Sequence, residues 1–326
     1  MRKIIRTVFN GSVFRALNSY LKYRRTNKGN LRLILSHYSA IAQVEISRSL
    51  NYQYDVVIGF MEGWSNHYAL SNKVISKRRI VWIHPDYKES YLIPEVDNDI
   101  LRKSNRIVLV SNQCKHNFDM IFPLYSEKSI VFENIVNREL LLKKSKEYEI
   151  DIDVEKLNMC TVCRCDIHVK GLDRILNALK RLKEDGLLSD LVWHLVGGGA
   201  DAEEIKKKVI EYELSNYIIL YGNIENPFPI LSRMDFFVLA SRYEGKPVSV
   251  EEALAMGIPC VVTRYASAHE QIAEGINGMI IENSDSSAYE ALKTCITNNE
   301  IIKMWKEKMS ASQKKNQDIA SFYTML

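Results

Sequence analysis

Two carboxylates and one helix start give the strongest chemical signal in this sequence. Glu244 and Glu252 bracket the segment Glu244-Gly245-Lys246-Pro247-Val248-Ser249-Val250-Glu251-Glu252. A helix starting at about Pro247 would point unpaired backbone N–H groups and its positive dipole end at a ligand, which suits a phosphate. Carboxylates beside a phosphate cannot be there to attract it, so we expect them to accept hydrogen bonds from neutral hydroxyls such as those of a sugar. The pattern predicts recognition of a nucleotide sugar.

The elements around this segment predict where the two carboxylates lie. Two short apolar runs, Phe236 to Ala240 and Ile258 to Val262, are typical of buried parallel strands. Apolar residues recur between them at helical spacing, from Val250 to Gly257. Glu244 is therefore expected in the loop after a strand's carboxyl end, where open parallel sheets bind ligands, and Glu252 about two turns later.

The same stretch resembles the signature of a known family. The run Ser241-Arg242-Tyr243-Glu244-Gly245-x-Pro247, continued by Glu252-Ala253-x-Ala255-x-Gly257-x-Pro259, is similar to that of retaining glycosyltransferases of family four (glycosyl transferases group 1). The resemblance covers nearly all the chain from about Tyr54 onward and is strongest to bacterial surface-polysaccharide enzymes. It implies a GT-B fold, with two Rossmann-like domains facing a cleft.

The resemblance also implies roles for the residues of this segment. In the family the first glutamate contacts hydroxyls of the donor sugar and the second holds the ribose, so these roles carry over to Glu244 and Glu252. The residues between them are expected to bind the donor: Gly245, Lys246, Pro247, Val248 and Ser249.

Two cations are expected on the leaving diphosphate. Arg164 and Lys170 flank the turn between an apolar strand, Met159 to Val162, and a helix marked by Leu172, Ile175, Leu176, Leu179 and Leu182. Cations there can neutralise a diphosphate and the charge that builds on it as the glycosidic bond breaks. In the family a Gly-Arg-apolar run and a Lys-Gly pair do this work; here Cys163 stands where Gly is usual.

Glycines after the next strands are expected to shape the nucleotide pocket. Gly197-Gly198-Gly199 ends the apolar run Val192 to Val196, and glycines let a backbone turn tightly and approach a ligand. By resemblance, Gly197 and Gly199 contribute to the pocket, while Gly222 and Ile224 supply backbone contacts to the base.

In the first half, His84 ends the apolar run Ile80 to His84. The family places a histidine here, near the donor sugar and the acceptor. The run Met61-Glu62-Gly63-Trp64-Ser65 also resembles its surface-polysaccharide branch. A general base is not required, because in a retaining front-face mechanism the leaving phosphate can take the acceptor's proton.

The order of apolar runs predicts an α/β protein with two domains. Strands are expected at Val56 to Phe60, Ile80 to His84, Arg106 to Val110 and Ser129 to Phe132, and then at Met159 to Val162, Val192 to Val196, Tyr217 to Tyr221, Asp235 to Ala240 and Ile258 to Thr263. The polar stretch 137–155 is the best linker candidate, so we expect a domain at 1–145 and a donor domain at 146–326, with the last helix packing back on the first domain. No Gly-rich loop precedes Val56, so the first domain is expected to be shortened.

Charge is spread unevenly over the 326 residues, whose net charge is +4. Before Glu45 lie nine Lys or Arg and no Asp or Glu, among apolar residues. This start is typical of a basic amphipathic helix on an anionic membrane surface, or else of a solvated face of its own domain. No nucleic-acid module accompanies the charges, so we expect no nucleic-acid partner. No apolar run is long enough to span a membrane.

The cysteines are expected to be reduced and buried, as in a cytoplasmic enzyme. Cys160, Cys163, Cys165 and His168 lie close in sequence and could suggest zinc. However, Cys160 and Cys163 would point to opposite faces of a strand, and structural zinc sites usually combine two segments. We therefore expect no metal.

With the resemblance, the sequence implies a retaining, metal-independent glycosyltransferase without cofactor. It would use a UDP-sugar rather than a GDP-sugar, and a polysaccharide or lipid-linked oligosaccharide acceptor of capsule, exopolysaccharide or O-antigen synthesis, at the inner face of the cell membrane. One alternative is a catalytically weak donor-binding subunit that needs a partner chain, or a truncated inactive form. Another, an epimerase or phosphorylase, gives no reason for the spacing of Glu244 and Glu252.

Overall fold

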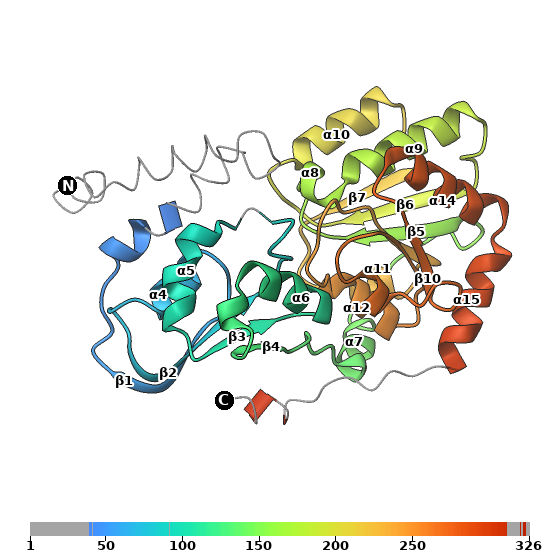
Figure 1. Ribbon diagram of the computed structural model, residues 1–326. Helices are drawn as coiled ribbons and strands as arrows, with labels where there is room; N and C mark the ends of the chain where they lie inside the picture. The colour runs from blue at the N-terminus through green and yellow to red at the C-terminus, as the bar shows by residue number, and fades with distance from the viewer. Residues whose placement is uncertain (1–38, 41, 91, 312–319, 321, 324–326) are drawn as a thin grey trace. The chain divides into compact units, whose positions relative to one another are not determined.

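The computed structural model describes residues 39–40, 42–90, 92–311, 320 and 322–323 (Figure 1). The chain divides into two compact units, Met1–Glu133 with Ile319–Leu326 and Asn134–Asp318. The basic start predicted at residues 2–32 lies outside the described residues. No described helix is both long and apolar enough to cross a membrane.

The first unit contains a four-stranded parallel sheet in the order β1-β2-β3-β4. Its strands are β1 (Gln53–Gly59), β2 (Ile75–Ile83), β3 (Arg106–Leu109) and β4 (Ser129–Val131), which confirms the four strands predicted for this half. The connections contain α4 (Trp64–Ala69), α5 (Pro94–Lys103), α6 (Asn112–Ile121) and the 3-10 helix η2 (Pro123–Tyr125). Such consecutive parallel strands with helical crossovers are typical of a Rossmann-like unit.

The core of this unit includes a residue from the far end of the chain. Trp82, Val108 and Phe118 are fully or almost fully buried in one apolar cluster. The ring of Phe322 packs on it, with its centroid 6.1 Å from that of Trp82 and 5.8 Å from that of Phe132. This contact ties Phe322 to the first unit.

The second unit contains a six-stranded parallel sheet in the order β10-β9-β8-β5-β6-β7. Its strands are β5 (Leu157–Val162), β6 (Leu191–Val196), β7 (Ile218–Gly222), β8 (Phe236–Leu239), β9 (Cys260–Thr263) and β10 (Gly278–Ile281). The first five confirm the predicted strands. The sequence prediction missed β10, a short strand that begins at a glycine and lies at the edge of the sheet, paired with β9.

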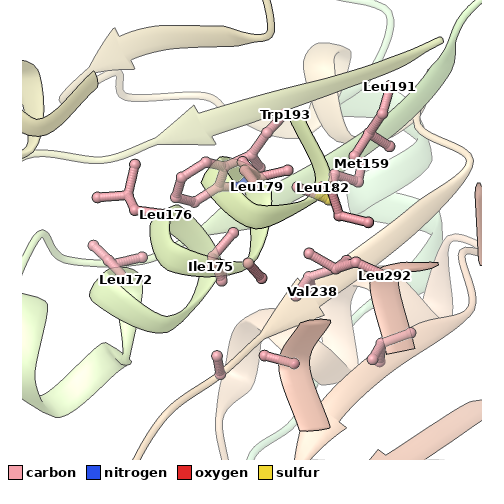
Figure 2. Close-up of a cluster of buried hydrophobic side chains, with 14 of the residues drawn as sticks. Met159, Leu172, Ile175, Leu176, Leu179, Leu182, Leu191, Trp193, Val238 and Leu292 are labelled. Carbon is pink, nitrogen blue, oxygen red and sulfur yellow. The ribbon is translucent and has the colours of Figure 1, made fainter. Parts of the chain in front are cut away.

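Helices cover both faces of this sheet. They are α7 (Arg138–Lys144), α8 (Ile167–Lys170), α9 (Leu172–Glu184), α10 (Ala202–Glu211), α11 (Phe228–Leu231), α12 (Val248–Ala255), α13 (Ala268–Gln271), α14 (Asp285–Thr297) and α15 (Glu300–Ala311). Figure 2 shows the predicted apolar face of α9, Leu172 to Leu182, packed against Trp193 and Val238 of the sheet and Leu292 of α14. Burial of this stripe holds α9, and hence the turn before it, on the sheet.

The stretch 137–155, expected as a linker, belongs to the second unit. Val136, Leu141 and Ile152 are buried in its second apolar cluster, and Arg138 Nε donates to the carbonyl of Ala255 over 2.9 Å. The boundary between the units therefore follows Glu133, and not residue 145 as expected. One buried leucine, Leu141, helps to dock the short helix α7, although the segment is polar on average.

The strand order places two loops side by side. β5 lies between β6 and β8, and the chain leaves β5 towards β6 but leaves β8 towards β9, in the opposite direction along the sheet. Such a switch point leaves a crevice at the carboxyl ends of the two strands. The loops that meet there carry Arg164 and Lys170 after β5 and Glu244 after β8.

Candidate functional site

Glu244 and Lys170 form a hydrogen-bonded ion pair at this switch point. Lys170 Nζ donates to Glu244 Oε1 over 2.6 Å, and the same oxygen accepts a hydrogen bond from Ser241 Oγ over 2.7 Å. The side chain of Lys170 is only 17% exposed and that of Glu244 only 12%. The structure thus brings together two residues predicted to act on the donor, and Ser241, which the site prediction did not include, orients the carboxylate.

Arg242 ties the two loops together. Its guanidinium binds both carboxylate oxygens of Asp173, at 2.9 and 2.6 Å, and donates to the carbonyl of His168 over 2.7 Å. Gly171 lies between, with φ of +61°, and a Cβ there would lie 1.9 Å from the carbonyl oxygen of Ala240. Close backbone contact and a bidentate ion pair therefore fix the distance between Lys170 and Glu244. The run Ser241-Arg242 just before Glu244 was the signal that could have revealed both supports.

A pocket of about 590 Å³ opens at the carboxyl ends of the same sheet. Four predicted site residues line it, Arg164, Gly197, Gly199 and Ile224; the remaining lining residues are Val162, Cys163, Val196, Gly198, Asn223 and Pro227. A Cβ on Gly197, whose φ is +141°, would lie 1.8 Å from the carbonyl oxygen of Cys163, so only glycine fits there. Gly222 is not a lining residue, but its carbonyl accepts the N–H of Gly197 over 2.8 Å.

Cys163 connects the pocket to the ion pair. It lines the pocket, and its thiol lies within electrostatic reach of Lys170, Glu244 and Arg164. Burial raises the pKa of this thiol to about 12, so the sulfur stays protonated at neutral pH. Cys163 is thus an uncharged pocket-lining residue near three charged groups. Its protonated thiol is not suited to act as a nucleophile.

Helix α12 begins where the sequence predicted. Its N-cap is Pro247, no side chain caps its first turn, and Val248 begins the helix. The carbonyl of Pro247 accepts from Gln271 Nε2 over 3.1 Å, which anchors the entry to the helix. The ammonium of Lys246 lies 3.7 Å from Glu251 Oε1 and its side chain is only 3% exposed, so this predicted donor-binding side chain is directed into the protein.

Glu252 lies on the middle of α12 and is not one of the residues that line the pocket. Burial raises the pKa of its carboxyl to about 6, and the charge of Lys144 on α7 offsets part of this rise. A carboxylate in such a site gains from hydrogen-bond donors, which neutral hydroxyls can supply.

In the first unit, His84 follows β2 and lies beside Glu62, which follows β1. The backbone N–H of His84 donates to Glu62 Oε1, and the ring nitrogen Nδ1 lies 3.4 Å from the same oxygen. The site prediction did not include Glu62. The signal was the run Met61 to Ser65, which follows a strand just as His84 does.

No group of three His, Cys, Asp or Glu side chains within the described ranges is arranged to hold a metal ion. Cys160 and Cys165, which suggested zinc by their spacing, lie in different apolar clusters of the second unit.

Comparison with known proteins decides the family. The model of the family "Glycosyl transferases group 1" matches residues 145–315, which include the pocket and the Lys170–Glu244 pair. This chain belongs to the glycosyl transferases group 1 family.

One curated relative of this chain is the N-acetylgalactosamine-N,N'-diacetylbacillosaminyl-diphospho-undecaprenol 4-alpha-N-acetylgalactosaminyltransferase of Campylobacter jejuni. It is 26% identical over 247 residues, or 74% of this chain and 60% of the relative. Another is the UDP-Gal:alpha-D-GlcNAc-diphosphoundecaprenol alpha-1,3-galactosyltransferase of Escherichia coli, 28% identical over 127 residues, or 38% of this chain and 33% of the relative. The chain spans 60% or less of the length of the first curated relatives it matches.

Solved structures show the same fold. HepE of Anabaena in complex with UDP and glucose aligns with a TM-score of 0.63 at 14% identity, over 76% of this chain and 69% of HepE. TarM of S. aureus, in a complex that contains UDP, aligns with a TM-score of 0.61 at 17% identity, over 78% of this chain and 50% of TarM. The expected GT-B fold, an α/β fold with two Rossmann-like units, is thereby confirmed.

Proposed function

We propose that this protein transfers a sugar, with retention of anomeric configuration, from a nucleoside diphosphate sugar to a lipid-linked oligosaccharide or polysaccharide. The observation that carries the proposal is the Lys170–Glu244 pair, 2.6 Å apart, at the switch point of the second sheet. It sets a cation suited to a phosphate beside a carboxylate suited to sugar hydroxyls. The cation therefore suits the diphosphate and the carboxylate suits the sugar, the two groups joined by the bond that must break.

The chain's own residues can supply the electrostatics of this transfer. The bond between the anomeric carbon and the diphosphate oxygen breaks, and a bond from the acceptor oxygen forms on the same face of the sugar. The acceptor's proton goes to the departing phosphate. Lys170 and Arg164 offset the charge that grows on the diphosphate, while Glu244 holds the sugar by its hydroxyls. These fixed cations do the work that a metal ion does elsewhere, so the reaction is proposed to be independent of metal.

The nucleotide is proposed to occupy the pocket of about 590 Å³. Gly197 and Gly199 allow close approach of the ligand to the backbone, Gly222 and Ile224 are proposed to meet the base, and Glu252 to hold the ribose. A UDP-sugar is proposed, because two of the aligned structures, HepE and TarM, contain UDP.

The acceptor and location are proposed from the relatives. The two curated relatives named above act on diphospho-undecaprenol substrates. An acceptor of this class lies in the membrane, so the protein is proposed to work at the inner face of the cell membrane. There the basic residues before Glu45 would meet anionic lipid. Capsule, exopolysaccharide or O-antigen synthesis is proposed as the process that the protein serves.

The proposal is tested by titrating the full chain with UDP-, GDP- and dTDP-sugars while following thermal unfolding. A ligand that binds only the native state stabilises it by about 2.7 kcal/mol at a concentration 100 times its Kd. We expect a UDP-sugar to raise Tm and the free sugar to leave it unchanged. Slow donor hydrolysis, with the anomer retained in the NMR spectrum of the released sugar, would separate a transferase from a donor-binding subunit. An unchanged Tm with every nucleotide sugar would refute the proposal.

A further inference from the structure

Glu62 and His84 form a buried contact in the first unit that the proposed function does not use. They follow the adjacent parallel strands β1 and β2, so both lie at one edge of the sheet. The side chain of Glu62 is 9% exposed and that of His84 is 25% exposed. A carboxylate this buried needs compensating donors.

One oxygen of Glu62 faces two nitrogens of His84. Oε1 accepts the backbone N–H of His84 and lies 3.4 Å from Nδ1 of the ring. Nδ1 is buried and makes no regular hydrogen bond within the described residues, so the 3.4 Å approach of Glu62 Oε1 is the polar contact that it does have there. An ionised carboxylate can only accept hydrogen bonds, so it favours a proton on the ring nitrogen that faces it.

The loop that carries Glu62 is held in place. Ser65 Oγ accepts the N–H of Phe60 over 3.2 Å, and Asn66 Nδ2 donates to the carbonyl of Trp82 on β2 over 3.0 Å. A Cβ on Gly59 would lie 2.4 Å from Asn66 Oδ1, so the strand end and the first turn of α4 are in close contact. The carboxylate of Glu62 is therefore fixed relative to β2, not free to follow the imidazole.

Aromatic rings fix the plane of the imidazole. The ring of Phe60 meets that of His84 edge to face, with centroids 5.1 Å apart, and the ring of Trp82 lies nearly parallel to it at 6.5 Å. With Nδ1 turned to Glu62, these contacts leave Nε2 as the ring nitrogen available to a ligand.

We propose that Glu62 is a positioning residue that holds His84 in the Nδ1–H tautomer, so that Nε2 presents a lone pair to a substrate hydroxyl. This proposal deepens the proposed function. That the hydroxyl belongs to a sugar substrate rests on the proposed function, but the tautomer of His84 does not. A fixed acceptor would orient a neutral sugar hydroxyl and reject a ligand group without a proton to donate.

The tautomer can be measured directly in the full chain labelled with ¹⁵N-histidine, at a pH where the rings are neutral. The His84 signals are assigned by their loss in His84→Asn. We expect Nδ1 protonated and Nε2 unprotonated in the wild type. A protonated Nε2 in the wild type would overturn the proposal, whether or not any variant folds and whether or not a donor is found.

Variants of Glu62 separate positioning from structure. Glu62→Leu removes the acceptor and should shift the ring towards the Nε2–H tautomer, lowering kcat by about tenfold or more with less than about a twofold change in KM for the donor. Glu62→Gln keeps a carbonyl acceptor and should restore both tautomer and most of kcat. Glu89→Gln, at an exposed glutamate of the same unit, is the matched control. Loss of activity in Glu62→Leu with the His84 tautomer unchanged would contradict the proposal.

Discussion

The ammonium of Lys170 and the carboxylate of Glu244 are joined by a 2.6 Å hydrogen bond between residues that are 74 positions apart in the sequence. Because both side chains are mostly buried, removing either partner leaves a charge without its neighbour. Each of the two residues must therefore be tested for folding as well as for activity.

Glu244→Gln should lower turnover of the donor by about 10² or more while binding of free UDP persists, because the proposed partner of Glu244 is the sugar. The measurement is kcat beside calorimetric UDP affinity. Glu203→Gln, an exposed glutamate on α10, serves as control. Wild-type turnover in Glu244→Gln would remove Glu244 from the site.

Lys170→Ala should reduce kcat more than donor affinity, because charge on the diphosphate grows as the bond breaks and a fixed cation is most useful then. Stopped assays of the wild type and the variant measure kcat and donor affinity. In the same assays, a chelator should change the rate little. An absolute need for Mg²⁺ or Mn²⁺ would show that Lys170 and Arg164 do not have the role proposed for them.

Glu252 should make folding stability depend on pH. Its carboxyl has a folded pKa of about 6, raised by burial from the ordinary 4.5. The folded state thus binds more protons than the unfolded state between about pH 4.5 and 6, so the free energy of unfolding falls as pH rises through this window. Urea unfolding from pH 4.5 to 7 measures the fall, and Glu252→Gln should flatten it. The same slope in wild type and variant would assign the dependence to another group.

Glu252→Ala should weaken binding of free nucleoside diphosphate, in contrast to Glu244→Gln. The proposed partner of Glu252 is the ribose, which donor and free nucleotide share. Calorimetry with UDP on both variants tests the contrast. Equal UDP affinity in wild type and Glu252→Ala would place the ribose elsewhere.

Cys163 should resist alkylation at pH 8, because burial raises its thiol pKa to about 12 and only the thiolate is nucleophilic. Mass spectrometry after brief iodoacetamide treatment of the native protein measures this. Cys163→Phe should weaken UDP binding by filling the pocket that Cys163 lines, whereas Cys163→Ser should bind nearly as wild type. Full UDP binding by Cys163→Phe would show that the nucleotide does not use this pocket.

The basic start should bind anionic vesicles. Each cation near such a surface contributes about 1 kcal/mol, so replacing Arg2, Lys3, Arg6 and Arg15 by Gln should remove several kcal/mol of attraction. Sedimentation with anionic and neutral vesicles at low and high salt tests this. Equal sedimentation with both kinds of vesicle, unaffected by the replacements, would identify the segment as a solvated face.

Local patterns in the sequence were sufficient for much of the second unit. The apolar spacing from Leu172 to Leu182 predicted α9 because a helix buries one face. Pro247 after a Gly-containing loop predicted the start of α12, because proline suits a helix entry. These features depend only on residues close in sequence.

The tertiary structure alone decided which residues meet. Strand order is not encoded in local periodicity, so the neighbourhood of β5 and β8, and with it the bond between Lys170 and Glu244, could not be read from the chain. The contact of Glu62 with His84 has the same origin, since it needs β1 and β2 to pair in parallel. The docking of Leu141 on the second unit depends on an apolar surface built by residues distant in sequence. Burial, pKa and pairing follow from these long-range contacts, whereas the elements follow from short-range ones.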